Sequence, residues 1–232
     1  MLSIENLVSA DTLTKFRIYE DLLLEWNRRT TLVQEDTLQH FNNRHVLDSL
    51  QIIPIIDNFF YPSPSAVPPI PIDISLKPGA KLDKPPKNIA DLLMIDVGTG
   101  AGFPGLIMAM CGFVNITLCE SNHRKCVFLE EVARQTGTRV SIVNKRVEDL
   151  AGTFDVVLSR ACADLETLCF MMSRLSRTSS SLGIFHKGKS WENEVIDAQR
   201  KWGFISQIYQ SITSPGSVIV TLRDLSRNSL DV

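Results

Sequence analysis

The sequence predicts an α/β fold of the Rossmann-like kind: a seven-stranded, mostly parallel sheet with helices on both faces and an N-terminal helical extension. Two observations carry this prediction. From residue 90 onward, short apolar runs alternate with amphipathic stretches, which is typical of a parallel sheet covered on both faces. In addition, residues 92–105 read LLMIDVGTGAGFPG, an apolar run that leads through a glycine-rich turn to a proline. That order indicates a strand, a ligand-binding turn and the start of a helix.

The remaining elements follow from hydrophobic periodicity and turn residues. Strands are expected over 92–97, 114–119, 139–143, 154–158, 182–187, 204–210 and 217–223. Helices are expected between them over 104–111, 122–136, 163–175 and 191–202. Only a turn at Ser214, Pro215 and Gly216 separates the last two strands, so the sheet should end in an antiparallel hairpin.

The sequence divides into four regions. Residues 1–60 are expected to form an N-terminal helical cap, with helices over 12–29 and 37–56, the second interrupted near His45 or Pro54. Residues 61–88 form a proline-rich insertion or linker, because they hold eight of the eleven prolines and proline disfavours both helices and central strands. Residues 89–225 form the ligand-binding domain, and residues 226–232 form a C-terminal tail.

Composition excludes several classes of protein. The chain has 232 residues, 44% of them hydrophobic, but no apolar run approaches the roughly 18 residues of a membrane span. Its N-terminus lacks the early basic residues of a secretory signal. Five cysteines occur without a C-x-x-C pair, which argues against a zinc site or a disulfide framework. We therefore expect a cytoplasmic protein with reduced thiols, no metal and no membrane partner.

The glycine-rich turn is the first part of the predicted binding site. Gly98, Gly100 and Gly102 allow positive φ angles and a close approach of the backbone to a ligand. Asp96 precedes them and places a carboxylate at the end of the strand, where open α/β sheets form their clefts. Glu120 follows the second strand, twenty positions after Gly100, where a carboxylate binds the hydroxyl groups of a ribose.

These residues alone leave two ligands open. Gly100, Gly102 and Gly105 also satisfy the G-x-G-x-x-G pattern of nicotinamide dinucleotide sites, and Glu120 suits the ribose of either ligand. Asp96 favours S-adenosylmethionine, because dinucleotide enzymes usually have an apolar residue there. The chain also has no second domain large enough for the separate substrate site of many dehydrogenases. Methyl transfer is therefore favoured over hydride transfer.

Cations follow the next strands. Arg160 ends the fourth strand, and Lys187 comes after the fifth, where phosphate or a guanine edge can be bound. Arg146 lies at the end of the third strand. Other cations that could complete a basic rim around the cleft are Arg28, Arg29, Arg44, Arg124, Lys125 and Lys145. Such a rim suits a phosphate-rich substrate, although the formal net charge is −2.

At this point several blocks resemble one known family in the same order. YEDLLLEWN and RHVLDSL resemble its opening signature, DVGTGAGFPG its cofactor loop, and FLEEVARQTG its second helix; KRVEDL, FDVVLSRACADL and FHKG resemble three later blocks. Together they resemble the glucose-inhibited division protein B family (RsmG) over nearly the whole chain. The chain departs from the family at RRTTLV, residues 28–33, and in the proline-rich insertion.

The resemblance implies a class I methyltransferase that uses S-adenosyl-L-methionine to methylate guanine N7 in small-subunit (16S) ribosomal RNA, at guanine 527. It implies cofactor contacts at Gly98, Phe103, Val147, Glu148 and Arg160. It places Arg146 and Lys187, with His45, toward the RNA, so the expected catalytic residues are Arg160, Lys187 and Arg146. The expected partner of this monomer is the RNA or the 30S subunit.

Three other functions stay open at this stage. A nicotinamide-dependent oxidoreductase would bind reduced nicotinamide and not S-adenosylmethionine. A silent binding module would bind S-adenosylmethionine or RNA and transfer no methyl group. A methyltransferase for a small molecule would transfer methyl but not to RNA.

Overall fold

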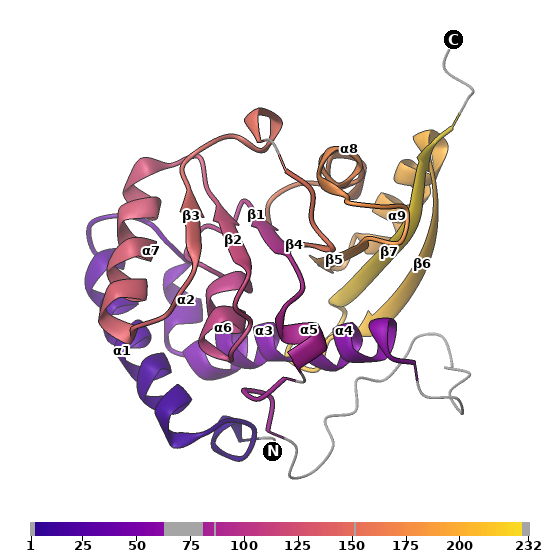
Figure 1. Cartoon of the computed structure of the whole chain (residues 1–232). Coiled ribbons are helices and arrows are strands. Elements are labelled where there is room, and N and C mark those ends of the chain that lie inside the picture. The colour runs from indigo at the N-terminus through magenta and orange to yellow at the C-terminus, as the bar shows by residue number, and fades with distance from the viewer. Residues whose placement is uncertain (1–2, 63–80, 86, 151, 229–232) are drawn as a thin grey trace.

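A computed structural model of the chain describes residues 3–62, 81–85, 87–150 and 152–228. It confirms the predicted α/β fold with one seven-stranded sheet (Figure 1). The strands are β1 (Met94–Val97), β2 (Ile116–Cys119), β3 (Ser141–Val143), β4 (Val156–Arg160), β5 (Leu182–Lys187), β6 (Trp202–Gln210) and β7 (Val218–Arg227). Each lies within a few residues of its predicted range, although β7 continues to Arg227, beyond its predicted end at residue 223.

The order of the strands locates the ligand-binding edge. The sheet runs β3-β2-β1-β4-β5-β7-β6, and its first five strands are parallel. The predicted hairpin is confirmed: β6 and β7 are antiparallel, and β7 lies between β5 and β6. Strand β2 pairs with one edge of β1, and β4 pairs with the opposite edge of β1. The topological switch point, where open sheets bind ligands, therefore lies between β1 and β4.

Helices connect the parallel strands as predicted. They are α6 (Gly105–Met110), α7 (His123–Thr136), α8 (Leu165–Leu175) and α9 (Trp191–Lys201). The N-cap side chain of Asn122 accepts hydrogen bonds from two backbone N–H groups of α7, and Asp164 does the same for Thr167 N in α8. Gly137 ends α7 in the left-handed conformation, with φ at +63°, as its position predicts.

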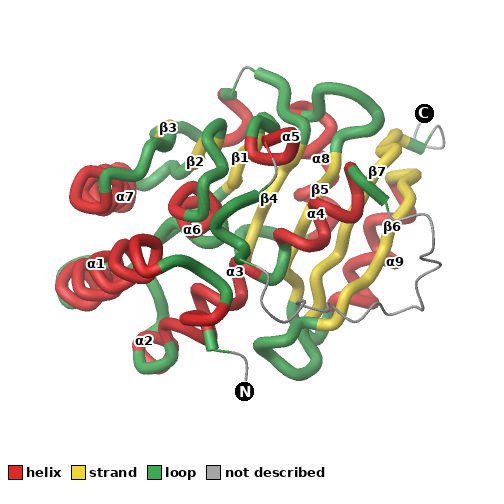
Figure 2. The backbone as a smooth tube through the Cα atoms, turned by 60° about the horizontal axis from the view of Figure 1, so that its bottom comes forward, coloured by secondary structure: helices red, strands yellow, loops and turns green. Residues whose placement is uncertain are grey.

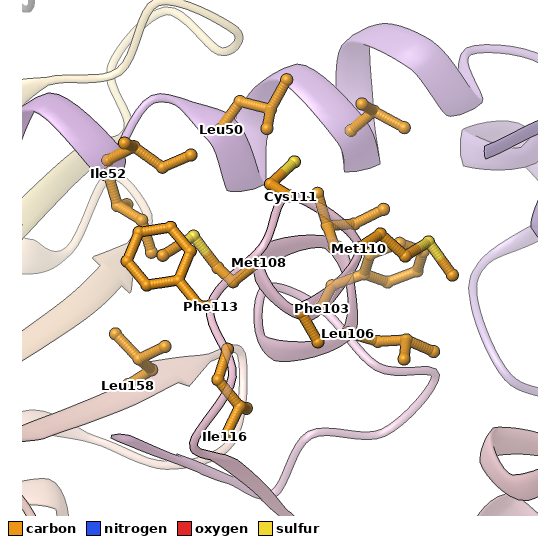
Figure 3. Close-up of a cluster of buried hydrophobic side chains, with 14 of the residues drawn as sticks. Leu50, Ile52, Phe103, Leu106, Met108, Met110, Cys111, Phe113, Ile116 and Leu158 are labelled. Carbon is orange, nitrogen blue, oxygen red and sulfur yellow. The ribbon is translucent and has the colours of Figure 1, made fainter. Parts of the chain in front are cut away.

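Successive side chains of the inner strands point alternately into two hydrophobic cores, one on each face of the sheet. On β1, Met94 packs in one core, while Ile95 and Val97 pack in the other. Figure 2 shows α8 and α9 on one side of the strands and α1, α3, α4 and α6 on the other. Figure 3 shows the second side, where Leu50 and Ile52 of the N-terminal region pack near Met108, Phe113 and Leu158. The near-continuous apolar sequence of β1 follows from burial on both faces.

The N-terminal cap shares this second core with the sheet. It comprises the 3₁₀ turn η1 (Ile4–Asn6) and helices α1 (Ala10–Asn27), α2 (Glu35–Leu38), α3 (Asp48–Leu50) and α4 (Ile53–Phe60), with a π-helical segment η2 (Asn42–Leu47) between α2 and α3. The interruption expected near His45 or Pro54 is found at both places, because η2 contains His45 and α4 begins at Ile53. Pro54 lies in the first turn of α4, where its missing N–H costs no hydrogen bond.

Only the end of the proline-rich insertion can be compared with its prediction, because residues 63–80 and 86 lie outside the described residues. Residues 81–85 pack against the N-terminal cap. Leu82 is buried and its N–H donates to the Leu7 carbonyl. The Asp83 carboxylate accepts from Ser9 N at 2.7 Å and from Thr12 Oγ1 at 2.8 Å. A short helix, α5 (Lys87–Ala90), which the sequence analysis missed, then leads to β1.

Candidate active site

The glycine-rich loop after β1 lies at the switch point and meets the loop after β4. Gly98 and Gly100 have φ angles of +62° and +61°, which L side chains rarely adopt. A Cβ at Gly98 would lie 2.2 Å from Cys162 Sγ and 2.9 Å from Cys162 Cβ, whereas one at Gly100 would meet only a carbonyl at 3.9 Å. Gly98 is therefore required by the close approach of the β4–α8 loop.

Asp96 holds the loop in place from beneath. Its side chain is fully buried, and Oδ2 accepts from Thr99 Oγ1 at 2.6 Å and from Gly105 N at 2.9 Å. Its other oxygen, Oδ1, is buried and has no hydrogen-bond partner among the described residues. Burial raises the pKa of Asp96 to about 6, even though the two hydrogen bonds oppose that shift. A buried carboxylate oxygen without a partner fits a site for a cationic group of a ligand.

Glu120 links the glycine-rich loop to the end of β2. Its Oε2 accepts from Gly100 N at 3.0 Å, and Oε1 accepts from Asn122 N at 2.8 Å. The structure thus brings together three residues that the sequence analysis assigned to a cofactor: Asp96, Gly100 and Glu120. Each carboxylate oxygen of Glu120 can accept a further hydrogen bond, which leaves capacity for the hydroxyl groups of a ribose.

Gly102 and Phe103, two further predicted cofactor contacts, are buried by the N-terminal cap. A Cβ at Gly102 would lie 2.9 Å from both Tyr19 Oη and Leu129 Cδ2. Phe103 is only 2% exposed, and its ring stacks near-parallel to those of Tyr19 and His45, with centroid distances of 5.2 and 4.6 Å. The Tyr19 hydroxyl donates to the Ala101 carbonyl. Packing of the cap against the loop therefore explains why residue 102 is a glycine and why the Phe103 ring is buried.

Arg160, the last residue of β4, is held by the N-terminal cap. Its Nη1 donates to the Arg44 carbonyl at 3.0 Å and to Asp48 Oδ2 at 3.1 Å. Its Nη2 lies 3.0 Å from His45 Nδ1, and its guanidinium carbon lies 4.7 Å from the centroid of the Phe103 ring. The planar fork of an arginine suits these simultaneous contacts, which a lysine would not reproduce.

His45 is neutral in this arrangement. A guanidinium can only donate, so Nδ1 accepts from Arg160 and the proton resides on Nε2, which lies 3.1 Å from Thr37 Oγ1. The Thr37 hydroxyl donates to the Gln34 carbonyl and thus accepts from His45. Burial and the positive charge of Arg160 lower the pKa of His45 to about 3. The imidazole therefore orients Arg160 without adding a charge.

Asp48 connects Arg160 to two other loops at the same edge. Its Oδ1 accepts from Thr213 Oγ1 at 2.5 Å and from Gln51 Nε2 at 2.8 Å, and its carbonyl accepts from His186 Nε2 at 2.9 Å. Burial tends to raise the pKa of Asp48, but His186, Arg160 and the Thr213 hydrogen bond together hold it below its ordinary value. Through its carboxylate and its carbonyl, Asp48 thereby joins the ends of β4 and β5 to the β6–β7 turn.

The segment that supplies these contacts is π-helical. Residues Asn42–Leu47 form η2, which contains both Arg44 and His45, and Asp48 follows directly. π-Helical turns are rare and frequently occur at functional sites. The sequence pointed to Arg44 and His45 individually, but to Asp48 only as part of the RHVLDSL block. The role of Asp48 required the fold, because its contacts lie 112 to 165 residues away in the sequence.

Lys187 lies at the end of β5 with its ammonium group engaged. Its Nζ lies 2.6 Å from Glu194 Oε2 and donates to the Ala163 carbonyl at 2.7 Å, and its side chain is only 6% exposed. Glu194 Oε2 also accepts from Leu165 N at 3.1 Å. Lys187 thus anchors the loop that carries Cys162, an interaction that the sequence did not reveal.

Val147 and Glu148, two further predicted cofactor contacts, follow β3 together with Arg146. Val147 is buried in the core beside α8, within the 3₁₀ turn η3 (Val147–Asp149). Glu148 and Arg146 are exposed on either side of it. No ion pair of Arg146 with an acid occurs within the described part of the chain. An exposed cation beside a turn at the carboxyl edge of the sheet is available to a polyanion.

No described helix is both long and apolar enough to cross a bilayer. No group of three or more histidine, cysteine, aspartate or glutamate side chains among them is arranged to hold a metal ion.

Comparison with known proteins assigns the site to a family. The family model described as rRNA small subunit methyltransferase G matches residues 12–74 and 81–220. The chain belongs to this family. A methyltransferase G from Paramagnetospirillum magneticum is 36% identical over 222 residues, which cover 95% of this chain and 92% of the relative. The relative from Rickettsia bellii (strain OSU 85-389) is 31% identical over 220 residues, 95% of this chain and 97% of its own length.

Membership of the rRNA small subunit methyltransferase G family decides for methyl transfer over hydride transfer. A solved structure supports the same fold: magnesium protoporphyrin IX methyltransferase from Synechocystis PCC 6803, described with bound SAM, has a TM-score of 0.50. It covers 93% of this chain and 98% of that chain at 11% identity, so the likeness concerns the fold alone. The chain is therefore a methyltransferase with the seven-stranded fold described above.

Proposed function

We propose that this methyltransferase transfers the methyl group of S-adenosyl-L-methionine to guanine N7 in small-subunit (16S) ribosomal RNA, at guanine 527. The observation that carries the proposal is the buried Asp96 Oδ1 beneath the Gly98–Gly100 loop, at the switch point of a chain in this family. The names of the relatives supply the substrate RNA. We further propose that the enzyme acts as a monomer in the cytoplasm.

The residues at the switch point fit S-adenosylmethionine. Asp96 Oδ1 would receive the ammonium group, and the backbone of Gly98 and Gly100 would lie against the ligand. Glu120 would accept from the ribose hydroxyls, and Val147 and Glu148 would flank the adenine. When bound, the cofactor supplies an electrophilic methyl group on a sulfonium centre.

The residues on the substrate side of the site position the RNA and do not exchange protons with it. Guanine N7 carries a lone pair and no proton, so its attack on a methyl carbon requires no general base. His45, with its pKa near 3, and Arg160, whose guanidinium stays charged, are suited to orientation rather than proton transfer. Positioning of two reactants is by itself a large source of rate enhancement.

We assign the cations different parts of this task. Arg160 fixes the wall between the cofactor loop and the N-terminal cap, where it lies against Phe103. Lys187 holds the β4–α8 loop through Ala163 and Glu194 and thereby keeps Cys162 over Gly98. Arg146 is exposed and contacts the RNA. Both Arg160 and Lys187 therefore act mainly through the groups that they hold.

The test uses methyl-labelled S-adenosylmethionine with small ribosomal subunits, or with their naked RNA, from a strain that lacks this modification. The proposal expects label in 7-methylguanosine with at least one of the two acceptors. Label in another nucleoside would overturn the assigned atom. Absence of transfer to both acceptors by a protein that binds the cofactor would favour a small-molecule substrate or a silent binding module.

The raised pKa of Asp96 predicts a pH dependence of cofactor binding. The cofactor ammonium requires the carboxylate form, whereas burial favours the neutral form below a pH of about 6. Affinity should therefore rise about tenfold from pH 5 to pH 7 and then level off, because one proton is released on binding. Calorimetric titration of the wild type and of Asp96→Asn measures this. The variant should bind weakly with no such rise; an equal rise in both proteins would refute the role of Asp96.

A further inference from the structure

A cleft lies between the end of α1 and the start of α7, outside the cofactor site. Its volume is about 380 Å³, and it is lined by Glu25, Trp26, Arg29, Thr30, His123, Arg124 and Val127. Figure 1 shows α1 and α7 next to each other at one side of the molecule, and Trp26 of α1 packs against Phe128 of α7. None of the residues that we assigned to cofactor binding, and none of those that contact Arg160, lines this cleft.

The cleft is favourable for an anion. Arg29, in the turn after α1, and Arg124, in the first turn of α7, line it, and both are exposed. Neither forms an ion pair with an acid anywhere in the described ranges, although Glu25 also lines the cleft. Arg28 and Lys125 adjoin them in the sequence, so two pairs of cations flank one acid. A phosphodiester would provide the negative charge that these arginines lack.

The walls of the cleft also offer apolar surface. The Trp26 ring is partly exposed, with its centroid 5.7 Å from that of Phe128, and Val127 is 37% exposed. Unpaired nucleobases stack on aromatic side chains in proteins that bind single-stranded nucleic acid, and each stack contributes about 1–3 kcal/mol. Arginines beside an exposed aromatic ring therefore match one nucleotide better than they match a free anion.

The position of the cleft connects it to the methyl-transfer site. His123 begins α7 only three residues after Glu120, whose carboxylate accepts from Gly100 N. On the far side, Asn144 Nδ2 donates to the carbonyls of Glu120 and Ser121, which places Lys145 and Arg146 beside the same turn. Cations thus extend along the carboxyl edge of the sheet from the α1–α7 cleft to η3.

We infer that the α1–α7 cleft binds an unpaired nucleotide of the substrate RNA at a distance from the methylated guanine. Arg29 and Arg124 bind its phosphates, and its base lies against Trp26 and Val127. This inference rests on the proposed function for the identity of the RNA. Contacts to phosphates position a nucleic acid without reading its sequence. The cleft should therefore raise affinity for the RNA and leave the chemical step unchanged.

The test compares two double variants with the same change in charge. Arg29→Glu with Arg124→Glu alters the cleft, while Arg17→Glu with Arg139→Glu alters exposed arginines elsewhere: Arg17 lies earlier on α1, and Arg139 follows the other end of α7. We expect the cleft variant to raise KM for an unmodified small-subunit RNA transcript at least tenfold, with kcat and cofactor Kd within twofold of wild type. The control variant should change KM less than threefold.

A salt titration tests the phosphate contacts separately from activity. In filter binding of the same transcript, Arg29→Ala with Arg124→Ala should reduce the slope of log K against log salt by about 1.4, because each phosphate contact to a single strand contributes about 0.7. An unchanged slope, or an equal loss in the matched control Arg17→Ala with Arg139→Ala, would overturn the inference. If the wild type binds RNA through the cleft yet never methylates it, the proposed function fails while the cleft stands.

Discussion

Gly98→Ala should lower the affinity for S-adenosylmethionine at least 100-fold, as measured by calorimetry. The added Cβ would lie 2.2 Å from Cys162 Sγ and 2.9 Å from Cys162 Cβ, closer than real Cβ contacts. The φ angle of +62° adds strain for any L side chain, roughly 1–2 kcal/mol. To relieve the overlap, the glycine-rich loop and the β4–α8 loop must move apart. The cofactor would then lose its contacts with the backbone of the glycine-rich loop.

A second glycine with nearly the same φ angle separates the effect of the overlap with Cys162 from the effect of backbone strain. Gly137 has a φ of +63°, and a Cβ there would meet nothing within 4 Å. Gly137→Ala should therefore carry a similar loss of stability with cofactor affinity unchanged. Combining Gly98→Ala with Cys162→Gly removes the overlap and should restore at least part of the affinity. Equal cofactor affinity in Gly98→Ala and wild type would contradict the assignment of this loop.

Arg160→Lys should reduce kcat for RNA methylation at least 100-fold. The lysine keeps the positive charge but cannot reach the Arg44 carbonyl, His45 and Asp48 simultaneously. The Asp48 side chain is only 14% exposed, so an imperfect partner also destabilises the protein, by about 3 kcal/mol if the ion pair is lost. Thermal unfolding measures this loss of stability. The kcat values are then compared at a temperature where the variant is fully folded.

One control variant and one second variant of the network distinguish a positioning role of Arg160 from general damage to the protein. Arg177 pairs with Asp155 at 3.4 Å but is 53% exposed, so Arg177→Lys should leave kcat within twofold of wild type. Asp48→Asn keeps the shape of the side chain and removes its charge, and it should lower kcat in the same direction as Arg160→Lys. If both variants at the network retain wild-type kcat while folded, Arg160 has no positioning role.

The parallel part of the fold could be predicted because β1 and β4 are buried on both faces and their sequences are nearly continuous apolar runs. Their connecting helices carry local end signals, such as Asn122 and Gly137, that act within a few residues. The hairpin could also be predicted from Ser214, Pro215 and Gly216. The insertion of β7 between β5 and β6 has no local signal, since it depends on which edges meet in space.

The proposed cofactor side of the candidate site could be predicted better than the proposed substrate side. Asp96, Gly100 and Glu120 are close because they follow neighbouring strands at one edge, a rule that applies to every open α/β sheet. The environment of Lys187 could not be predicted, since Glu194 lies on the next helix and its orientation depends on packing. The same holds for Asp48, whose partners come from three distant segments.

The N-terminal cap was predicted as helical, with Arg44 at the rim of the cleft and His45 toward the RNA, but its packing against the glycine-rich loop was not predicted. Its periodicity shows that Tyr19 faces a core, yet periodicity cannot say that this core includes Phe103 of the cofactor loop. The π-helical turn that contains Arg44 and His45 also has no recognised sequence pattern. These contacts make the cap part of the candidate active site, and they explain why Gly102 tolerates no side chain.

The most direct test of the central claim replaces the attacking atom. Two transcripts of the small-subunit RNA are prepared, one with guanosine and one with 7-deazaguanosine, in which carbon replaces N7. With labelled S-adenosylmethionine, we predict 7-methylguanosine from the first transcript and no transfer to the second, with both transcripts bound with similar affinity. Equal labelling of the two transcripts would contradict methylation at N7 and would move the reaction to another atom of the RNA.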